Sequence, residues 1–395
     1  MASANAKHTE KASAPYRMLD AWRGLASLWV MGYHAVEVMI KQHGLSSSSW
    51  LVKLLGNGVL GVPMFFVISG YCISTAALAA LQRGHSAARF AKARLRRIFP
   101  TYWAALALTA LLSIAAEMLV QSGRLHSSDL ASRNVASRSL AWYAANLTLA
   151  NPLLHGKDYL VMQAWSLSYE AAFYLMIGLM LMAAAWRNSR ETLLWCAHVI
   201  TLAAIALLLY RPRLLHFPLD LWPEFGLGVL LYHSTHRRSN PALAAIWVLA
   251  GIGLTLLYTL YHSRLIGWNT DASVTFQYPF AFLFALLLLL LYPQDERIVR
   301  WRIARMLGSI GIFSYTLYLT HTFSIGLVNH AIKFLHLSRS YNAAAFLAMT
   351  AGAVIFARVF YEAAEKPFLS QAGRARAKEL GTAVPAAPPA QEQAR

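Results

Sequence analysis

Long apolar runs separated by short polar segments dominate the pattern along the chain. About ten of these runs approach 20 residues, the length an α-helix needs to cross the hydrocarbon layer of a membrane. They cover residues 22–42, 58–80, 101–120, 164–185, 192–210, 215–234, 242–261, 273–292, 308–330 and 341–363. The pattern therefore predicts an all-α, polytopic integral membrane protein with about ten transmembrane helices.

Lysine and arginine residues are distributed unequally between alternate loops. Those on the side of the N-terminus outnumber those on the opposite side by roughly two to one, which predicts that both termini are cytoplasmic. We expect a polar cytoplasmic N-terminus over residues 1–17, a transmembrane domain over 18–369, and a disordered cytoplasmic tail over 370–395 that is rich in Ala, Pro and Gln. The longest extracytoplasmic segment, 121–163, is expected to lie at the interface or to re-enter the membrane.

Composition agrees with a membrane protein and excludes several other classes. The chain is 57% hydrophobic and 13% charged, with a mean hydropathy of +0.44. Its net charge of +18 comes from basic residues in short loops between apolar runs, so no nucleic-acid partner is expected. Cys72 and Cys196 both fall in apolar runs, and the histidines lack metal-ligand spacing, so we predict neither a disulfide framework nor a metal site.

The first apolar run contains two titratable residues, Arg23 and His34. Eleven positions at 100° each place both side chains on one helix face, separated by roughly 16 Å along the axis. Such residues inside a membrane span are commonly functional, although Arg23 could reach the head groups while His34 bonds to a neighbouring helix. Glu37 follows three positions later, where it could orient the imidazole or be an interfacial carboxylate.

Two further stretches lie close to the second and third runs. The segment Phe65-Phe66-Val67-Ile68-Ser69-Gly70 combines aromatic bulk with a small polar step, which is typical of close helix packing. The basic stretch from Arg89 to Arg97 fits ordinary positive-inside charge and contact with anionic lipid. Pro100 follows it at a position typical of a helix start.

Later runs also contain polar groups. Glu170 falls at the outer end of its run, where a carboxylate at shallow depth costs little. His321 lies in the middle of its run beside Tyr315 and Tyr318, where a neutral histidine bonded to a tyrosine would satisfy both groups.

Taken together, these stretches form an ordered series of motifs from residue 17 to residue 369. They are Leu19-Asp20-Ala21-Trp22-Arg23-Gly24-Leu25-Ala26 followed by His34; Phe65-Phe66-Val67-Ile68-Ser69-Gly70-Tyr71; Arg94-Leu95-Arg96-Arg97-Ile98-Phe99-Pro100-Thr101-Tyr102-Trp103; Trp165-Ser166-Leu167-Ser168-Tyr169-Glu170 with Phe173-Tyr174; Ser314-Tyr315-Thr316-Leu317-Tyr318-Leu319-Thr320-His321; and Glu365-Lys366-Pro367. This series resembles the membrane-bound acyltransferase 3 family, whose members O-acylate surface polysaccharides, other glycans and some small molecules.

The resemblance implies a function and a role for individual residues. It implies transfer of an acyl group, acetyl above all, from cytoplasmic acyl-coenzyme A to a hydroxyl of an extracytoplasmic or lipid-linked glycan, in the inner membrane of a bacterium and without a metal. The residues divide into a catalytic set, a donor-binding set and a set along the acceptor or acyl path. The catalytic set is His34, Arg23 and Glu170; the donor-binding set is Arg94, Arg97, Tyr102 and Ser69; the path set is Tyr315, His321 and Trp165.

Two other functions use the same residues. In a secondary transporter or flippase of a lipid-linked sugar, Arg23, His34 and Glu170 would bind substrate or relay protons. In an acyltransferase acting on a small molecule, the mechanism would be the same and only the acceptor would differ.

Overall fold

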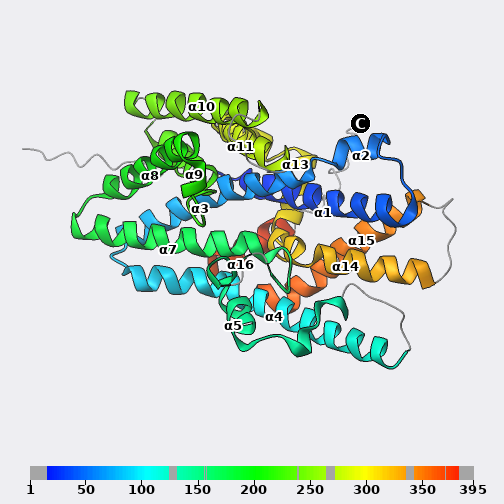
Figure 1. The fold of residues 1–395 in the computed structure, drawn as a ribbon. Helices are drawn as coiled ribbons and strands as arrows, with labels where there is room; N and C mark the ends of the chain where they lie inside the picture. The colour runs from blue at the N-terminus through cyan, green and yellow to red at the C-terminus, as the bar shows by residue number, and fades with distance from the viewer. Residues whose placement is uncertain are drawn as a thin grey trace, which may run out of the picture.

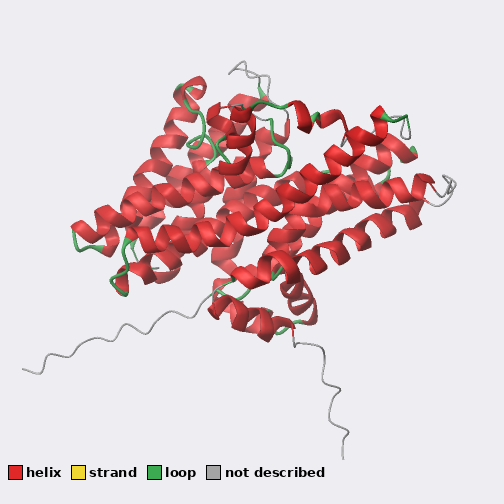
Figure 2. Cartoon of the chain, turned by 90° about the horizontal axis from the view of Figure 1, so that it is seen from below, coloured by secondary structure: helices red, strands yellow, loops and turns green. Residues whose placement is uncertain are grey.

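The computed structural model describes residues 16–123, 131–154, 156, 158–237, 240–263, 272–334, 342–369 and 371–381. Within these residues the chain forms helices and connecting loops, with no strand (Figures 1 and 2). This confirms the predicted all-α class.

In the described part of the chain, every predicted apolar run coincides with a long helix. The long helices are α1 (Leu19–His43), α3 (Gly61–Gln82), α4 (Ala87–Gln121), α7 (Ala164–Trp186), α8 (Arg190–Tyr210), α9 (Trp222–His236), α10 (Pro241–His262), α11 (Ala272–Leu291), α14 (Ser314–Phe334) and α15 (Asn342–Phe360). Shorter helices are α2 (Trp50–Leu55), α5 (Leu140–Thr148), α6 (Asn151–Leu154), α12 (Asp295–Ile298), α13 (Arg302–Gly311) and α16 (Gln371–Gly381).

Among the described residues, 7 helical segments are long and apolar enough to cross a membrane. Together they confirm a polytopic membrane protein. Helices α1, α9 and α14 are not among the 7. Helix α9 has only 15 residues, and α1 and α14 carry polar side chains that lower their hydropathy. A total of ten spans and the cytoplasmic termini stay predictions.

Two helix boundaries differ from the predicted runs. The run 215–234 contains a loop before α9, which begins at Trp222 with Pro223 in its first turn. The run 308–330 is divided, because α13 ends at Gly311 and α14 begins at Ser314. Hydrophobicity alone does not show these breaks, since the loop residues are nearly as apolar as the helices.

The basic stretch before the third run is helical rather than a loop. Helix α4 begins at Ala87, where the Ser86 hydroxyl accepts a hydrogen bond from the amide of Arg89 (3.2 Å). Pro100 therefore lies inside α4 and not at its start, which membrane helices tolerate. Consequently, Arg94 and Arg97 share one face of a helix that continues into the bundle.

The segment before α7 folds back against the bundle. The hydroxyl of Tyr102 donates to the carbonyl of Asn146, and Trp103 Nε1 donates to the carbonyl of Leu147 (2.9 Å). These bonds attach α5 to the middle of α4 (Figure 1). The two predicted alternatives for 121–163, an interfacial position and re-entry, stay predictions.

Both ends of the described chain pack on the bundle. Tyr16 donates from its hydroxyl to the carbonyl of Leu288 (3.0 Å), and the amide of Arg17 donates to Asp295 Oδ2 (2.8 Å). Part of the segment expected to be a disordered tail is helix α16, which packs on α13. Alanine, arginine and lysine in α16 have high helix propensity. Residues 1–15 and 382–395 lie outside the described residues.

Glycines allow two pairs of helices to cross closely. A Cβ added to Gly70 on α3 would overlap the carbonyl oxygen of Phe225 on α9, and one added to Gly228 would overlap that of Val67. A Cβ at Gly24 on α1 would likewise overlap the carbonyl oxygen of Leu307 on α13. Close backbone approach is a main source of helix association in membranes. These crossings fix α3 against α9 and α1 against α13.

We predict that Gly70→Ala destabilises the protein by about 1–3 kcal/mol, because the added methyl group must displace α9. The unfolding midpoint of the purified protein in detergent measures the effect. Gly178→Ala is the matched control, since a Cβ at this position in α7 meets no atom within 4 Å and alanine favours the helix. Equal midpoints for the two variants would contradict a tight α3–α9 crossing.

Candidate active site

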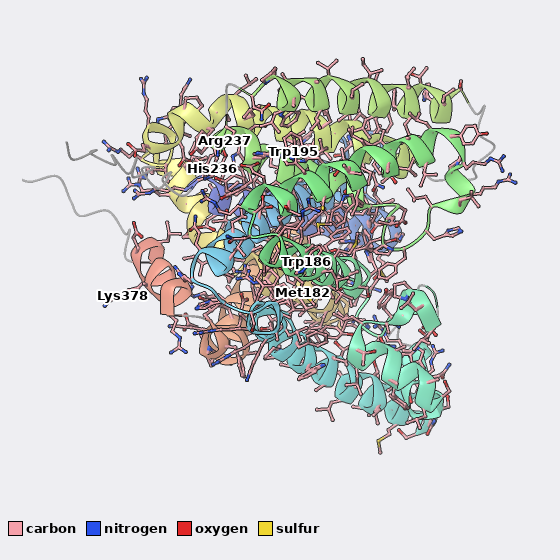
Figure 3. All side chains as sticks on the ribbon, turned by 90° about the vertical axis from the view of Figure 1, so that its left-hand side faces the viewer. Met182, Trp186, Trp195, His236, Arg237 and Lys378 are labelled. Atoms are coloured by element: carbon pink, nitrogen blue, oxygen red, sulfur yellow. The ribbon has the colours of Figure 1, made fainter. Side chains whose placement is uncertain are left out.

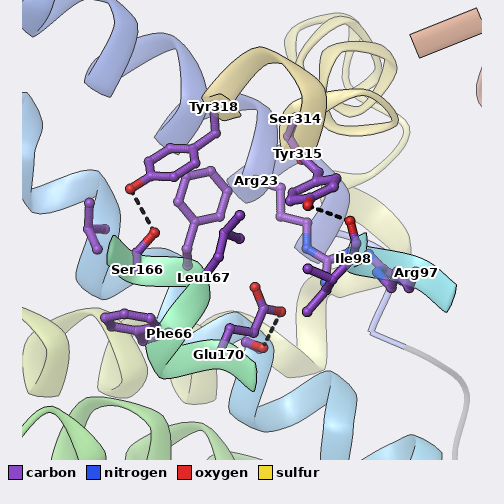
Figure 4. Close-up of a pocket in the computed structure, with 13 residues that line it drawn as sticks. Arg23, Phe66, Arg97, Ile98, Ser166, Leu167, Glu170, Ser314, Tyr315 and Tyr318 are labelled. Atoms are coloured by element: carbon purple, nitrogen blue, oxygen red, sulfur yellow. Dashed lines mark hydrogen bonds between the residues drawn. The ribbon is translucent and has the colours of Figure 1, made fainter. Parts of the chain in front are cut away.

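A cavity of ≈ 80 Å³ lies where α1, α3, α4, α7 and α14 meet (Figure 4). Its lining combines charged, hydroxyl and aromatic side chains. The lining residues are Arg23, Val62, Phe65, Phe66, Ser69, Arg97, Ile98, Ser166, Leu167, Glu170, Ser314, Tyr315 and Tyr318. Arg97 is exposed, so the cavity reaches the surface beside the basic stretch of α4.

Arg23 enters the cavity from the first turns of α1. Its Nη1 lies 3.6 Å from Asp20 Oδ1 and its Nη2 lies 3.5 Å from Cys72 Sγ on α3. Its side chain is 19% exposed. These contacts leave guanidinium donors for a ligand, and Figure 4 shows the side chain pointing into the same space as the Glu170 carboxylate.

Glu170 is held by hydroxyl groups from two helices. Ser69 on α3 donates to its Oε1 (3.1 Å), and the Tyr174 hydroxyl, one turn along α7, donates to the same oxygen. The second oxygen, Oε2, accepts neither of these bonds and lies on the cavity side. The Ser69 hydroxyl therefore acts here as a donor that positions the Glu170 carboxylate.

The structure changes the expected neighbours of Glu170. The sequence placed it at the outer end of its run, yet it shares the cavity with Arg23 and Tyr315, which lie in the first turns of α1 and α14. Those helices are predicted to begin on the opposite side of the membrane. Helices α5 and α6 precede α7 and pack against α4, and Glu170, in the second turn of α7, faces the cavity.

Helix α14 forms one wall of the cavity. Tyr315 donates from its hydroxyl to the carbonyl of Ile98 on α4 (2.9 Å), and the hydroxyl groups of Tyr318 and Ser166 are 2.9 Å apart. The Phe65 ring packs edge-on against Tyr318, with ring centroids 5.5 Å apart. Aromatic rings therefore narrow the cavity between α3 and α14.

Beyond Tyr318, two histidines continue the polar series. His321 is fully buried, and its Nδ1 lies 2.7 Å from the carbonyl oxygen of Tyr318, which requires a proton on Nδ1. Its Nε2 is buried and has no hydrogen-bond partner among the described residues. The His321 and His34 rings are 5.1 Å apart between centroids.

His34 is the accessible member of this pair. Its side chain is 27% exposed, and its Nδ1 lies 2.9 Å from Glu37 Oε2. Of the two alternatives for Glu37, the bond supports the one in which this carboxylate orients the imidazole. A proton on Nδ1 that donates to Glu37 leaves a lone pair on Nε2, as a general base or a nucleophile requires.

Three predicted residues lie beside the cavity and do not line it. Arg94 packs its guanidinium over the Phe90 ring, and its buried Nε has no hydrogen-bond partner among the described side chains and backbone groups. Tyr102 is fully buried and holds α5. Trp165 contacts Tyr169 edge-on, next to Glu170 on α7.

Several residues around the cavity had no individual role in the sequence-based prediction. Ser166, Tyr174 and Phe65 lie inside the quoted motifs, but spacing along one helix does not show which partner each meets. Glu365 is 6% exposed and accepts a hydrogen bond from the Thr316 hydroxyl, directly after Tyr315 on α14. In the described part of the chain, no group of three or more His, Cys, Asp or Glu side chains could hold a metal ion.

Comparisons with known proteins connect this site to a family. A family model described as "Acyltransferase domain" matches residues 16–361. The chain is 27% identical over 336 residues to a "Putative membrane-bound transacylase BcsY" of Komagataeibacter xylinus, which covers 80% of this chain and 75% of that protein. It is 26% identical over 215 residues to "O-acetyltransferase OatA" of Staphylococcus aureus, which covers 51% of this chain and 31% of that protein.

No solved structure matches the chain. The family match extends from the first described residue to the end of α15, and so it includes every residue that lines the cavity. The chain therefore belongs to the family defined by this acyltransferase domain, and it is a membrane-bound acyltransferase.

Proposed function

We propose that this acyltransferase, in the inner membrane of a bacterium, moves an acetyl group from cytoplasmic acetyl-coenzyme A to a hydroxyl of an extracytoplasmic or lipid-linked glycan. The observation that carries the proposal is the continuous series of polar groups from Arg97 and Arg23, through Tyr318, to His321 and His34. The names of the relatives, a transacylase and an O-acetyltransferase, support the reaction class.

The size of the cavity limits which part of the donor enters it. A volume of ≈ 80 Å³ is far below the roughly 300–1,000 Å³ of pockets that enclose a whole ligand. The nucleotide would therefore stay at the surface beside Arg97, whose guanidinium suits phosphate. Arg23 and Arg97 would hold phosphate groups, with Arg94 and Tyr102 supporting this face of α4.

The distance between Arg23 and His34 determines which part of the donor each residue can contact. Eleven positions along α1 separate them by roughly 16 Å, so one thioester carbonyl cannot contact both. An extended pantetheine arm of roughly 15–20 Å covers that distance. Arg23 would hold the donor at one end of the arm, and the thioester would meet His34 at the other.

His34 would then act as a general base on the acceptor. Its Nε2 removes the proton of the acceptor hydroxyl, the hydroxyl oxygen attacks the thioester carbonyl, and the C–S bond breaks to release the thiolate. Glu37 stabilises the imidazolium through the Nδ1 bond. In a variant of this route Nε2 carries the acyl group, and mass spectrometry of a quenched reaction would detect the acyl-histidine.

We predict that His34→Ala lowers acetyl transfer about 10²–10⁴-fold, the usual contribution of a general base. The assay is transfer from labelled acetyl-coenzyme A to a glycan acceptor in proteoliposomes. His330→Ala is the matched control, because His330 is an exposed histidine whose Nδ1 bonds to the Gly326 carbonyl. Wild-type activity in His34→Ala would rule out this mechanism. A transporter would return its substrate without a covalent acyl group.

We predict that Arg23→Lys lowers kcat/KM for acetyl-coenzyme A about tenfold or more, since lysine keeps the charge but loses the planar fork of donors. Steady-state kinetics with varied donor concentration measures the change. Arg96→Lys, an exposed position on the same basic helix, should leave kcat/KM near the wild-type value. An equal loss in both variants would show a general effect of surface charge.

We predict that Phe65→Ala extends the range of acyl chain lengths that the enzyme accepts, because the Phe65 ring narrows the cavity against Tyr318. Wild type should prefer acetyl- over octanoyl-coenzyme A, and the variant should reduce that preference by about tenfold. Competition between the two donors measures the ratio directly. An unchanged ratio would mean that chain length is selected elsewhere.

A further inference from the structure

A second group of buried polar side chains lies between α8 and α9. His198 Nε2 and His233 Nδ1 are 3.0 Å apart, and His233 Nε2 lies 3.2 Å from Glu191 Oε2. Both imidazoles are 1% exposed, whereas Glu191 is 43% exposed. The three side chains therefore lie in a row from the surface into the bundle, with a close ionic contact and no hydrogen bond between His233 Nε2 and Glu191.

Charged and aromatic side chains surround this series. Arg237 Nη2 lies 3.5 Å from Glu191 Oε1, and Trp195 packs edge-on against both imidazoles. His236 directs its Nδ1 to the carbonyl of Tyr232. Figure 3 shows Trp195, His236 and Arg237 together at one end of the molecule. The side chains form a line and do not converge, which suits proton transfer better than metal binding.

Another buried acidic group lies at the opposite end of α9. Glu224 is 0% exposed, and neither carboxyl oxygen has a hydrogen-bond partner among the described residues. An ionised carboxylate in such a place is too costly, so Glu224 carries a proton. Asp220, four positions before Glu224, accepts a hydrogen bond at Oδ2 from the Tyr169 hydroxyl (2.7 Å).

The two ends are connected by the helix interface between them. Glu224 and His233 are nine positions apart on α9, which is roughly 13 Å. Thr201 lies one turn beyond His198 on α8, and Trp222 donates from its Nε1 to the Thr201 hydroxyl (3.1 Å). His198 Nδ1, both Glu224 oxygens and Asp220 Oδ1 are buried without a hydrogen-bond partner in the described chain. Buried water satisfies such atoms and transfers protons between them.

We propose that Glu191, His233, His198, Glu224 and Asp220 form a proton pathway along the α8–α9 interface, separate from the acyl path between α1 and α14. Histidines and a protonated carboxyl group in line inside a membrane protein are the groups from which proton relays are built.

Acyl transfer across a membrane would require such a pathway for charge balance. This part of the inference rests on the proposed function. The C–S bond of the thioester breaks and a C–O bond to the acceptor forms. The thiolate takes a proton from the cytoplasm, and the acceptor hydroxyl releases its proton on the outer side. Each turnover thus moves charge against the membrane potential, and one proton returning through α8–α9 cancels this movement.

The first test measures proton flux without donor or acceptor. Wild-type protein is placed in vesicles that contain a pH-sensitive dye, and a potassium gradient with valinomycin imposes a potential. Glu224→Gln and His198→Gln, at the two ends of the gap, should each lower the flux about tenfold. Glu296→Gln and His236→Gln change exposed residues of the same types and should leave it unchanged. Equal flux in wild type, both pathway variants and empty vesicles would overturn the pathway.

The second test separates this inference from the proposed function. In detergent, where both faces share one solution, the two pathway variants should transfer acetyl groups at the wild-type rate. In sealed vesicles they should be several-fold slower, and a protonophore should restore the rate. If the two variants reach the wild-type rate in sealed vesicles without the protonophore, the pathway is contradicted. The proposed acyl transfer is not affected by that result. If wild type forms no acylated product even in detergent, the proposed function fails, and the flux measurement still decides the pathway.

Discussion

The burial of a guanidinium group among membrane helices is the constraint on which the arrangement of the bundle depends. Arg23 must be enclosed by protein, because lipid cannot solvate its charge. The flanking turns provide this enclosure: Gly24 lets α1 meet the carbonyl of Leu307, and Gly311 lets α13 meet the carbonyl of Asp20. With α13 closing one side, the side chain extends toward α3 and α7, where Cys72 and the cavity lie.

Much of the fold follows from one-dimensional patterns. Apolar runs identified every long helix in the described chain, and helix periodicity placed Arg23 and His34 on one face, where both now belong to one polar series. These patterns did not predict the division between α13 and α14, nor the position of Glu170 beside Arg23. Both depend on contacts between segments far apart in the sequence, such as the Ser69–Glu170 bond, which no local pattern encodes.

Membership of a motif also does not show whether a residue takes part in the reaction or holds helices together. Tyr102 belongs to the same motif as Arg97, yet its buried hydroxyl attaches α5 to α4. Glu37 lies outside the quoted motifs, yet it makes the bond that orients His34. The motifs named residues that the fold brings to one cavity, among them Arg23, Glu170 and Tyr315, whereas individual roles depend on the partner of each side chain. Hydrogen-bond partners, which depend on tertiary packing, therefore carry the information that spacing lacks.

Neighbouring residues on α3 and α7 face two different polar systems. Ser69 bonds to Glu170 in the cavity, while the next residue, Gly70, contacts the backbone of α9. On α7, Glu170 faces the cavity, while Tyr169 bonds to Asp220 at the end of α9. The α8–α9 interface and the acyl cavity are therefore adjacent through α3 and α7, because Gly70 and Tyr169 contact the α9 side while Ser69 and Glu170 line the cavity.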